Sequence, residues 1–149
     1  MIAFTRRAMI GAVLALGIVS PAVAQDDGVH RLALQISDND PQKMTTVLNV
    51  AANVTRLYQD RGEEVDIRIV AFNAGLHMLR EDTSPVLERL TSFGQSMPNV
   101  TFAACGNTIT GMTKKEGVAP PISAHAEVVP AGAVELITLD EAGWTIIRP

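Results

Sequence analysis

The segment 65–72, VDIRIVAF, decides the fold class of this chain. Polar and apolar residues alternate in its first half, whereas both faces of its second half are apolar. A strand that is buried on both faces is typical of a parallel sheet covered by helices. Asn73–Gly75 follow, and residues of these types commonly end a strand. The segment therefore predicts an α/β fold with the sheet in the interior.

Four further apolar runs are expected to be strands, at residues 30–36, 100–105, 127–129 and 144–147. Helical patterns separate them. The first helix begins at Asp40-Pro41, a carboxylate N-cap followed by proline, and ends before Gly62. Ser84-Pro85 repeats this start for a second helix. A helical turn is expected at 76–79 and helices at 107–116 and 132–142, with Gly143 ending the last. This alternation predicts an open α/β fold with a mostly parallel five-stranded sheet.

Residues 1–24, MIAFTRRAMIGAVLALGIVSPAVA, have the three parts of a secretory signal peptide. Arg6 and Arg7 form a charged beginning, an apolar run follows, and Ala22-Val23-Ala24 matches a cleavage site. The apolar run is shorter than the ~20 residues of a membrane span, although an uncleaved anchor is the alternative. Thr5-Arg6-Arg7 also resembles a twin-arginine signal. We therefore expect a periplasmic protein, exported by the general secretory (Sec) or twin-arginine route, with one domain at residues 25–149.

The acidic composition excludes several classes of partner. The chain has a net charge of −4, and loss of Arg6 and Arg7 with the leader makes it −6. Nucleic acids and anionic membrane surfaces attract basic faces, so we expect no nucleic acid and no membrane as partners after signal cleavage. Cys105 is the only cysteine, so no internal disulfide can form. Stability then has to come from the core and from assembly into a homo-oligomer.

Three polar segments follow predicted strands: Ser37–Asp40, Asn73–His77 and Cys105–Thr108. In open parallel sheets, functional groups gather at the carboxyl edge, where strands end and loops begin. We therefore expect these three segments to converge on one site.

Cys105 is the candidate catalytic residue of that site. It should lie where the third strand ends and a helix begins, and unpaired N–H groups there stabilise a thiolate. Gly106 allows close approach of the backbone, while Asn107 and Thr108 can cap the helix or donate hydrogen bonds to the sulfur. The alternative is a buried structural cysteine, because free cysteine is among the most buried residues.

The remaining polar residues do not form a metal or nucleotide motif. His77 is a candidate base or metal ligand, although histidine also takes many ordinary roles. His30 and His125 have no ligand-spaced neighbours, and no glycine-rich phosphate loop occurs. We therefore predict no metal and no cofactor. Asn49 and Asn53 lie one turn apart on the first helix and face either the same site or solvent.

The chain resembles the DsrE/DsrF-like family of sulfur-relay proteins, in its small single-domain branch. The resemblance rests on Ser37-Asp38, the Asn49/Asn53 helix and the segments 70–75 (VAFNAG), 102–108 (FAACGNT), 128–132 (VVPAG) and 143–149 (GWTIIRP). It implies a flavodoxin-like three-layer α/β sandwich that assembles into trimers or hexamers. It also implies that Cys105 accepts sulfur as a persulfide from a donor protein and passes it to an acceptor protein.

Two functions of different classes follow. The first is an exported sulfur carrier or thiol-redox protein that uses Cys105. Because the chain has no second cysteine, a thiol from a partner would have to remove the sulfur. The alternative is a non-catalytic ligand-binding or assembly protein, in which Asn73, Gly75, His77 and Cys105 form a pocket and the thiol is structural. An intermolecular disulfide through Cys105 is a third possibility.

Overall fold

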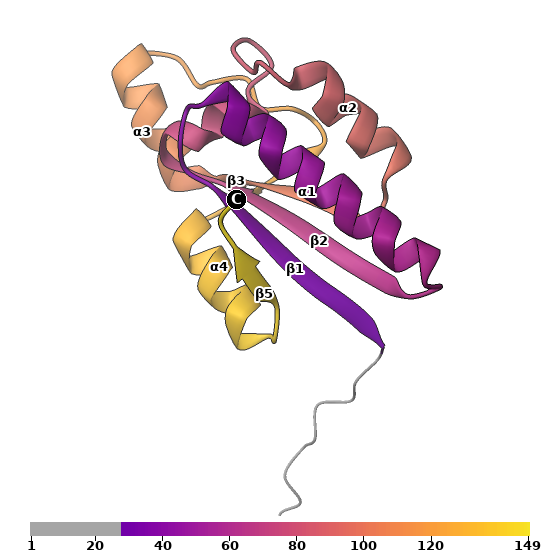
Figure 1. The fold of residues 1–149 in the computed structure, drawn as a ribbon. Helices are drawn as coiled ribbons and strands as arrows, with labels where there is room; N and C mark the ends of the chain where they lie inside the picture. Colours follow the sequence, from indigo (N-terminus) through magenta and orange to yellow (C-terminus); the bar gives the residue numbers. More distant parts are fainter. Residues whose placement is uncertain (1–27) are drawn as a thin grey trace, which may run out of the picture.

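The computed structural model describes residues 28–149 (Figure 1), and the expected signal peptide lies outside them. Strands and helices alternate along the chain. Their order is β1 (Val29–Ile36), α1 (Pro41–Asp60), β2 (Glu64–Ala71), the 3-10 helix η1 (Asn73–Leu79), α2 (Leu87–Ser96), β3 (Val100–Cys105), α3 (Gly106–Glu116), β4 (Ala126–Val129), α4 (Gly132–Glu141) and β5 (Thr145–Ile147).

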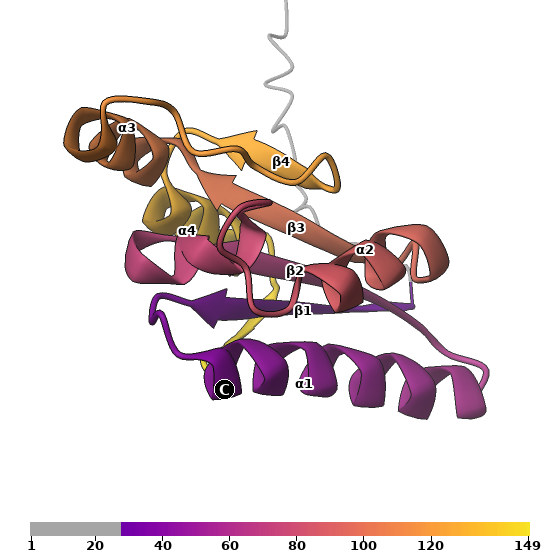
Figure 2. The ribbon, with the colours of Figure 1, turned by 90° about the horizontal axis from the view of Figure 1, so that it is seen from above.

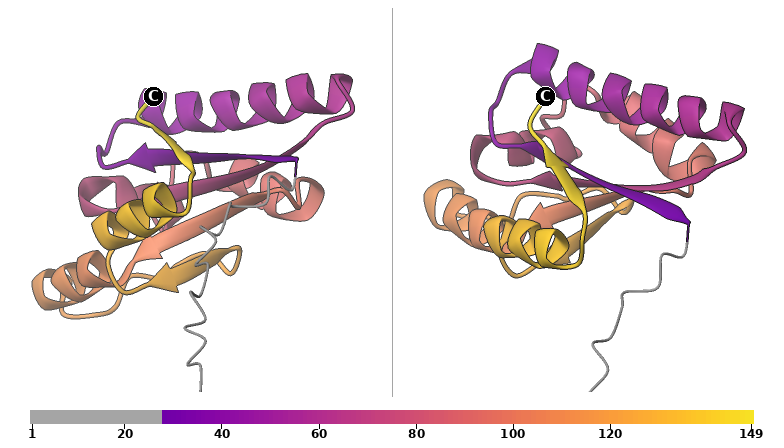
Figure 3. Two further views of the ribbon diagram at one scale, coloured as in Figure 1. Left: turned by 90° about the horizontal axis from the view of Figure 1, so that it is seen from below. Right: turned by 60° about the horizontal axis from the view of Figure 1, so that its bottom comes forward.

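The five strands form one sheet in the order β4-β3-β2-β1-β5, and every neighbouring pair is parallel. From β1 to β4 each connection moves one strand in the same direction, as Figure 2 shows. Right-handed crossovers then place their helices on one face of the sheet. The connection from β4 to β5 returns to the far edge beside β1 (Figure 3), so α4 covers the opposite face.

The result is a three-layer α/β sandwich, with α1, α2 and α3 on one side of the sheet and α4 on the other (Figure 1). This confirms the predicted flavodoxin-like fold class. The larger core lies under α1 and α2, where Leu34, Ile69 and Phe102 pack against Met44 and Leu90. The smaller core lies under α4, and it consists of Val70, Ala103 and Val129 with Phe72, Leu136 and Leu139 packed against it.

The helix ends follow from local chemistry. The Asp40 carboxylate accepts a hydrogen bond from the Gln42 N–H at 2.8 Å, and Pro41 is the first residue of α1. Gly62 and Gly143 both have positive φ after their helices, as expected of glycine stops. No helix within residues 28–149 is long and apolar enough to cross a membrane.

The second helix begins later than its proline pattern predicts. Helix α2 starts at Leu87, and Ser84 is not its N-cap. The Ser84 hydroxyl instead donates to the Met78 carbonyl at 2.6 Å and accepts from the Val86 N–H at 3.3 Å. Ser84 therefore closes the turn that precedes the helix.

Candidate functional site

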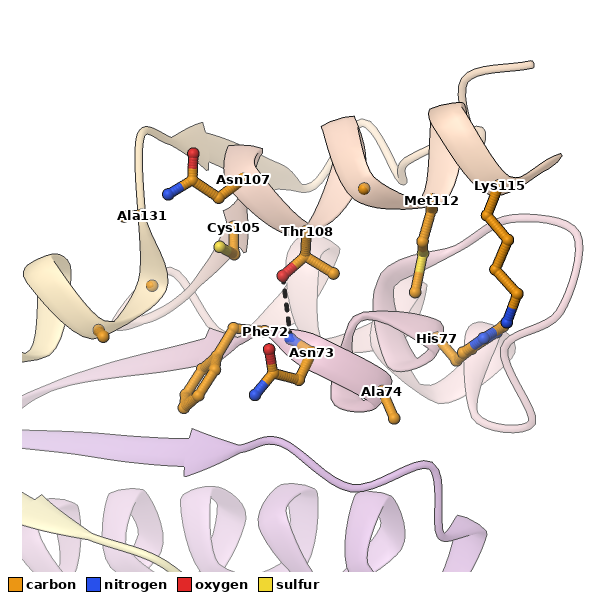
Figure 4. Close-up of a pocket in the computed structure, with 13 residues that line it drawn as sticks. Phe72, Asn73, Ala74, His77, Cys105, Asn107, Thr108, Met112, Lys115 and Ala131 are labelled. Atoms are coloured by element: carbon orange, nitrogen blue, oxygen red, sulfur yellow. Dashed lines mark hydrogen bonds between the residues drawn. The ribbon is translucent and has the colours of Figure 1, made fainter. Parts of the chain in front are cut away.

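An open pocket of about 670 Å³ lies at the carboxyl edge of the sheet (Figure 4). It occupies the point where β3 leads into α3 on one face and β4 leads into α4 on the other. Such a switch in direction leaves a crevice between neighbouring strands, which is where open α/β sheets bind ligands. Segments after β2, β3 and β4 contribute the lining residues, which are Phe72, Asn73, Ala74, His77, Cys105, Asn107, Thr108, Gly111, Met112, Lys115, Ala131, Gly132 and Ala133.

Cys105 is the last residue of β3 and the N-cap of α3, and it is 5% exposed. Burial acts to raise the pKa of its thiol. Hydrogen bonds from the Thr108 hydroxyl and from the backbone N–H groups of Gly132, Thr108 and Asn107 act in the opposite direction, and the net pKa is lowered. The Asn107 contribution is the weakest of these, and its N–H also donates to the Pro130 carbonyl at 3.2 Å. The site therefore stabilises a sulfur anion.

The Thr108 hydroxyl is held in place by the neighbouring strand end. Its oxygen accepts a hydrogen bond from the Asn73 N–H at 3.0 Å, drawn as a dashed line in Figure 4. Asn73 has φ of 49°, the only positive value among the described residues other than glycine. Asparagine tolerates this left-handed conformation better than most residues. The bond from Asn73 fixes the position of the oxygen, and the hydroxyl proton remains available for the sulfur of Cys105.

Two glycines bring the backbone donors close to the sulfur. A Cβ on Gly132 would lie 2.9 Å from the Cβ of Phe72, so α4 can begin at this point only without a side chain. A Cβ on Gly106 would lie 3.0 Å from the Val129 carbonyl oxygen, so α3 begins tightly against the end of β4. Gly106 is not among the lining residues and acts on the site only through this packing.

Gly75 lies beside the pocket and has a structural role there. A Cβ there would lie 2.3 Å from the Ile36 carbonyl oxygen and 2.8 Å from the Ser37 nitrogen. Backbone atoms cannot move aside as a flexible side chain can, so this position requires glycine. Gly75 joins η1 to the end of β1 and does not line the pocket, although it was predicted as a binding residue.

His77 lines the pocket but is not a partner of Cys105. Its Nδ1 lies 2.8 Å from the Thr83 hydroxyl. Figure 4 shows it with Lys115 at the end of the pocket away from Cys105. No hydrogen bond joins His77 to Cys105 in the described part of the chain, so this histidine is not placed as a base for the thiol.

The expectation that Ser37–Asp40 joins the site was wrong. Asp38 binds Lys43 and Arg148, each at 2.9 Å, and Asp40 caps α1. The pKa of the Asp38 carboxyl is lowered by its hydrogen bonds to Lys43 and Arg148. The third segment that lines the pocket is instead Ala131–Ala133, which follows β4. Asn49 lies elsewhere, because its side-chain oxygen accepts from Arg89 at 2.7 Å, and Asn53 is exposed.

Sequence reasoning identified Asn107 and Thr108 at the start of α3 but missed the pocket residues further along this helix, which are Gly111, Met112 and Lys115. Thr108, Gly111, Met112 and Lys115 follow the i, i+3, i+4, i+7 spacing of one helix face. That spacing is visible in the sequence, but Gly111 and Met112 in the middle of this face carry no charged or hydrogen-bonding group that would mark it as a site. Among the described residues that line the pocket, Lys115 is the only lysine or arginine, and none is an aspartate or glutamate.

Sequence reasoning also did not identify Arg80 as a buried residue beside the pocket. Arg80 is only 4% exposed. Its guanidinium donates to both oxygens of Asp82, at 2.8 and 2.7 Å, and to both oxygens of Glu116, at 2.7 and 2.9 Å. Hydrogen bonds to Asp82 and then to Glu116 raise the pKa of Arg80. This cluster connects the end of η1 to the last turn of α3. Because α3 forms one wall of the pocket, the cluster stabilises that wall.

No group of three or more histidine, cysteine, aspartate or glutamate side chains with metal-binding geometry occurs in residues 28–149. Cys105 is a free thiol.

No family model matches the chain, and no curated protein matches it either. Among solved structures, the chain is similar to a protein of unknown function, MTH1491, from Methanobacterium thermoautotrophicum. The two share 26% sequence identity with a TM-score of 0.65, and the similarity covers 80% of this chain and 99% of that one. This likeness supports the α/β fold over nearly the whole described part of the chain.

Proposed function

We propose that this protein is an exported, DsrE-like sulfur carrier or thiol-redox protein that holds sulfur on Cys105 as a persulfide. The observation that carries the proposal is the convergence of donors on one sulfur atom: the Thr108 hydroxyl and the N–H groups of Gly132, Thr108 and Asn107. Donors directed at one atom stabilise negative charge there, and a thiolate is the reactive form of cysteine. Membership of the DsrE/DsrF-like family is part of this proposal.

In the loading step, the Cys105 thiolate attacks the outer sulfur of a donor persulfide, R–S–SH. A sulfur–sulfur bond forms between Cys105 and that sulfur, while the sulfur–sulfur bond of the donor breaks. The donor leaves as R–S⁻ with the electron pair of the broken bond, and it takes up the proton released by the persulfide. No net oxidation occurs. A thiolate of an acceptor then attacks the outer sulfur in the same way and regenerates the Cys105 thiolate.

The proposal also includes a periplasmic location and assembly into homo-trimers or homo-hexamers. It further includes partner proteins that donate sulfur to Cys105 and accept sulfur from it. Support for assembly comes from α4, where Val134 and Ile137 are 58% and 57% exposed. These two side chains lie one turn apart on α4, and exposed apolar side chains that form a continuous patch mark surfaces that bind another chain.

The test is persulfide transfer to the purified, reduced protein. Incubation with a persulfide donor, followed by intact-mass spectrometry, is expected to add one sulfur atom to the native protein and none to Cys105→Ser. Thr108→Val is expected to load more slowly, because the anion loses one donor. Equal loading of the native protein and Cys105→Ser would contradict the proposal.

The 5% exposure of Cys105 favours a second candidate, a non-catalytic ligand-binding or assembly protein with a structural thiol. The two candidates differ in how the thiol reacts in the folded protein. A structural thiol is alkylated only as fast as the fold opens, so denaturant would accelerate its labelling greatly. A persulfide site reacts in the native state, and denaturant would then have a small effect.

A further inference from the structure

The pocket at Cys105 is longer than an inorganic sulfur anion. The lining face of α3 runs from Thr108, which contacts the sulfur, to Lys115. These residues are seven apart, which corresponds to about 10 Å along the axis at 1.5 Å per residue. The volume of about 670 Å³ lies in the range that accommodates an organic ligand.

The charge of the lining selects the ligand class. Lys115 is charged, and no aspartate or glutamate is among the thirteen lining residues. Asp82 and Glu116 lie near this end of the pocket but are bound to Arg80. Within residues 28–149, Lys115 forms no salt bridge of its own. A positive group without a salt-bridge partner, in a pocket that no carboxylate lines, favours an anionic ligand.

Polar groups lie between the two ends of the pocket. The side chains of Asn73 and Asn107 line it, and in the described part of the chain neither forms a hydrogen bond to another residue. Met112 contributes an apolar wall between Cys105 and Lys115 (Figure 4). Amide side chains can donate to and accept from peptide groups. The lining therefore matches a peptide-like chain with an acidic end.

We infer that the pocket binds a low-molecular-weight organic persulfide that carries a carboxylate, with its sulfur at Cys105 and its carboxylate at Lys115. This inference rests on the proposed function for the role of the ligand's sulfur atom, but the ligand can bind without transferring that sulfur to Cys105. It makes the sulfur donor a small peptide-like thiol compound that is held by the pocket before Cys105 reacts.

Binding is tested without chemistry in the Cys105→Ser protein, titrated with reduced glutathione and followed by the backbone amide signals in nuclear magnetic resonance. Saturable shifts at Thr108 and Gly132 are expected. Lys115→Gln in the same background is expected to weaken binding about threefold, as for removal of a solvent-exposed ion pair. Lys114→Gln is the matched control, because Lys114 is the neighbouring lysine on α3 but does not line the pocket.

Three results would overturn the inference: no saturable shift at the pocket, equal weakening by both lysine variants, or tighter binding of thiosulfate than of glutathione. The last result would indicate a site for inorganic sulfur anions. Transfer from glutathione persulfide to the native protein separates this inference from the proposed function. Binding without transfer would contradict the proposed function alone, whereas transfer that is unchanged in Lys115→Gln would contradict the inference alone.

Discussion

The backbone N–H of Asn73 donates to Oγ1 of Thr108 at 3.0 Å and thereby connects the end of β2 to the sulfur site at the end of β3. A hydroxyl can accept a bond and donate its proton at the same time, so Thr108 accepts from Asn73 and donates to Cys105. Asn73 has φ of 49°, so the chain turns away from the direction of β2 at the residue that makes this bond. Two strand ends therefore cooperate to stabilise one anion.

Replacement of Thr108 tests this connection. Thr108→Val keeps the shape of the side chain but removes the hydroxyl, so the pKa of Cys105 should rise toward its ordinary value. Alkylation at pH 7 should slow by about tenfold, because a hydrogen bond to a charged group is worth roughly 1.5–3 kcal/mol. The pH profile of alkylation is the measurement. Thr108→Ser retains the hydroxyl and should retain the native profile; a shift as large as that of Thr108→Val would contradict this explanation.

The lowered pKa of Cys105 also predicts how stability depends on pH. Between the folded pKa and the ordinary value of 9.0, the unfolded chain binds more protons at this residue than the native protein does. Stability should therefore rise with pH in that window and become level above it. The measurement is the difference in unfolding free energy between the native protein and Cys105→Ser at several pH values. A difference that does not grow with pH would show that the thiolate is not stabilised.

Gly132→Ala should damage both the fold and the site. The added methyl group would lie 2.9 Å from the Cβ of Phe72, so the start of α4 has to move and its N–H has to leave the sulfur. We expect a loss of about 1–3 kcal/mol in urea unfolding, as for other overpacked sites, together with a higher pKa for Cys105. Gly111→Ala is the control. Its Cβ would meet no atom within 4 Å, and alanine in a helix should stabilise by about 0.5–1 kcal/mol.

Arg80→Met should loosen the wall of the pocket. The substitution removes the buried guanidinium and with it the bonds to Asp82 and Glu116. We expect the free energy of unfolding to fall by about 2 kcal/mol, in the range for hydrogen bonds to charged groups. Arg148→Met removes a pair with Asp38 in which the arginine side chain is 55% exposed, and should change stability by less than about 1 kcal/mol. Urea unfolding of both variants checks the contrast, and equal losses would show that the Arg80 cluster is not special.

The sequence predicted the elements of this fold because their signals are local. Apolar runs identified all five strands, and Asp40-Pro41 and Gly62 marked the ends of α1 within a residue or two. The start of α2 was misplaced, since the contact that decides it is a hydrogen bond from Ser84 to Met78 in η1. Strand order depends on the direction of each crossover, which local patterns do not record.

The candidate site was predicted in part for the same reason. Cys105, Asn107 and Thr108 follow one strand, so their proximity is a local property. Gly132 reaches the sulfur only because β4 pairs beside β3. Ser37–Asp40 follows β1, which β2 separates from β3, and Asp38 in this segment binds Lys43 and Arg148. Arg80 was invisible to pattern analysis, because an arginine is expected at the surface unless carboxylates from elsewhere in the fold accompany it.

The central claim, that Cys105 carries sulfur, is tested most directly on protein isolated from cells without reductant. Intact-mass spectrometry should show a species heavier than the unmodified protein by one sulfur atom, which disappears on reduction and is absent from Cys105→Ser. An unmodified thiol that resists alkylation until the protein is denatured would contradict the claim and leave Cys105 as a structural residue of the core.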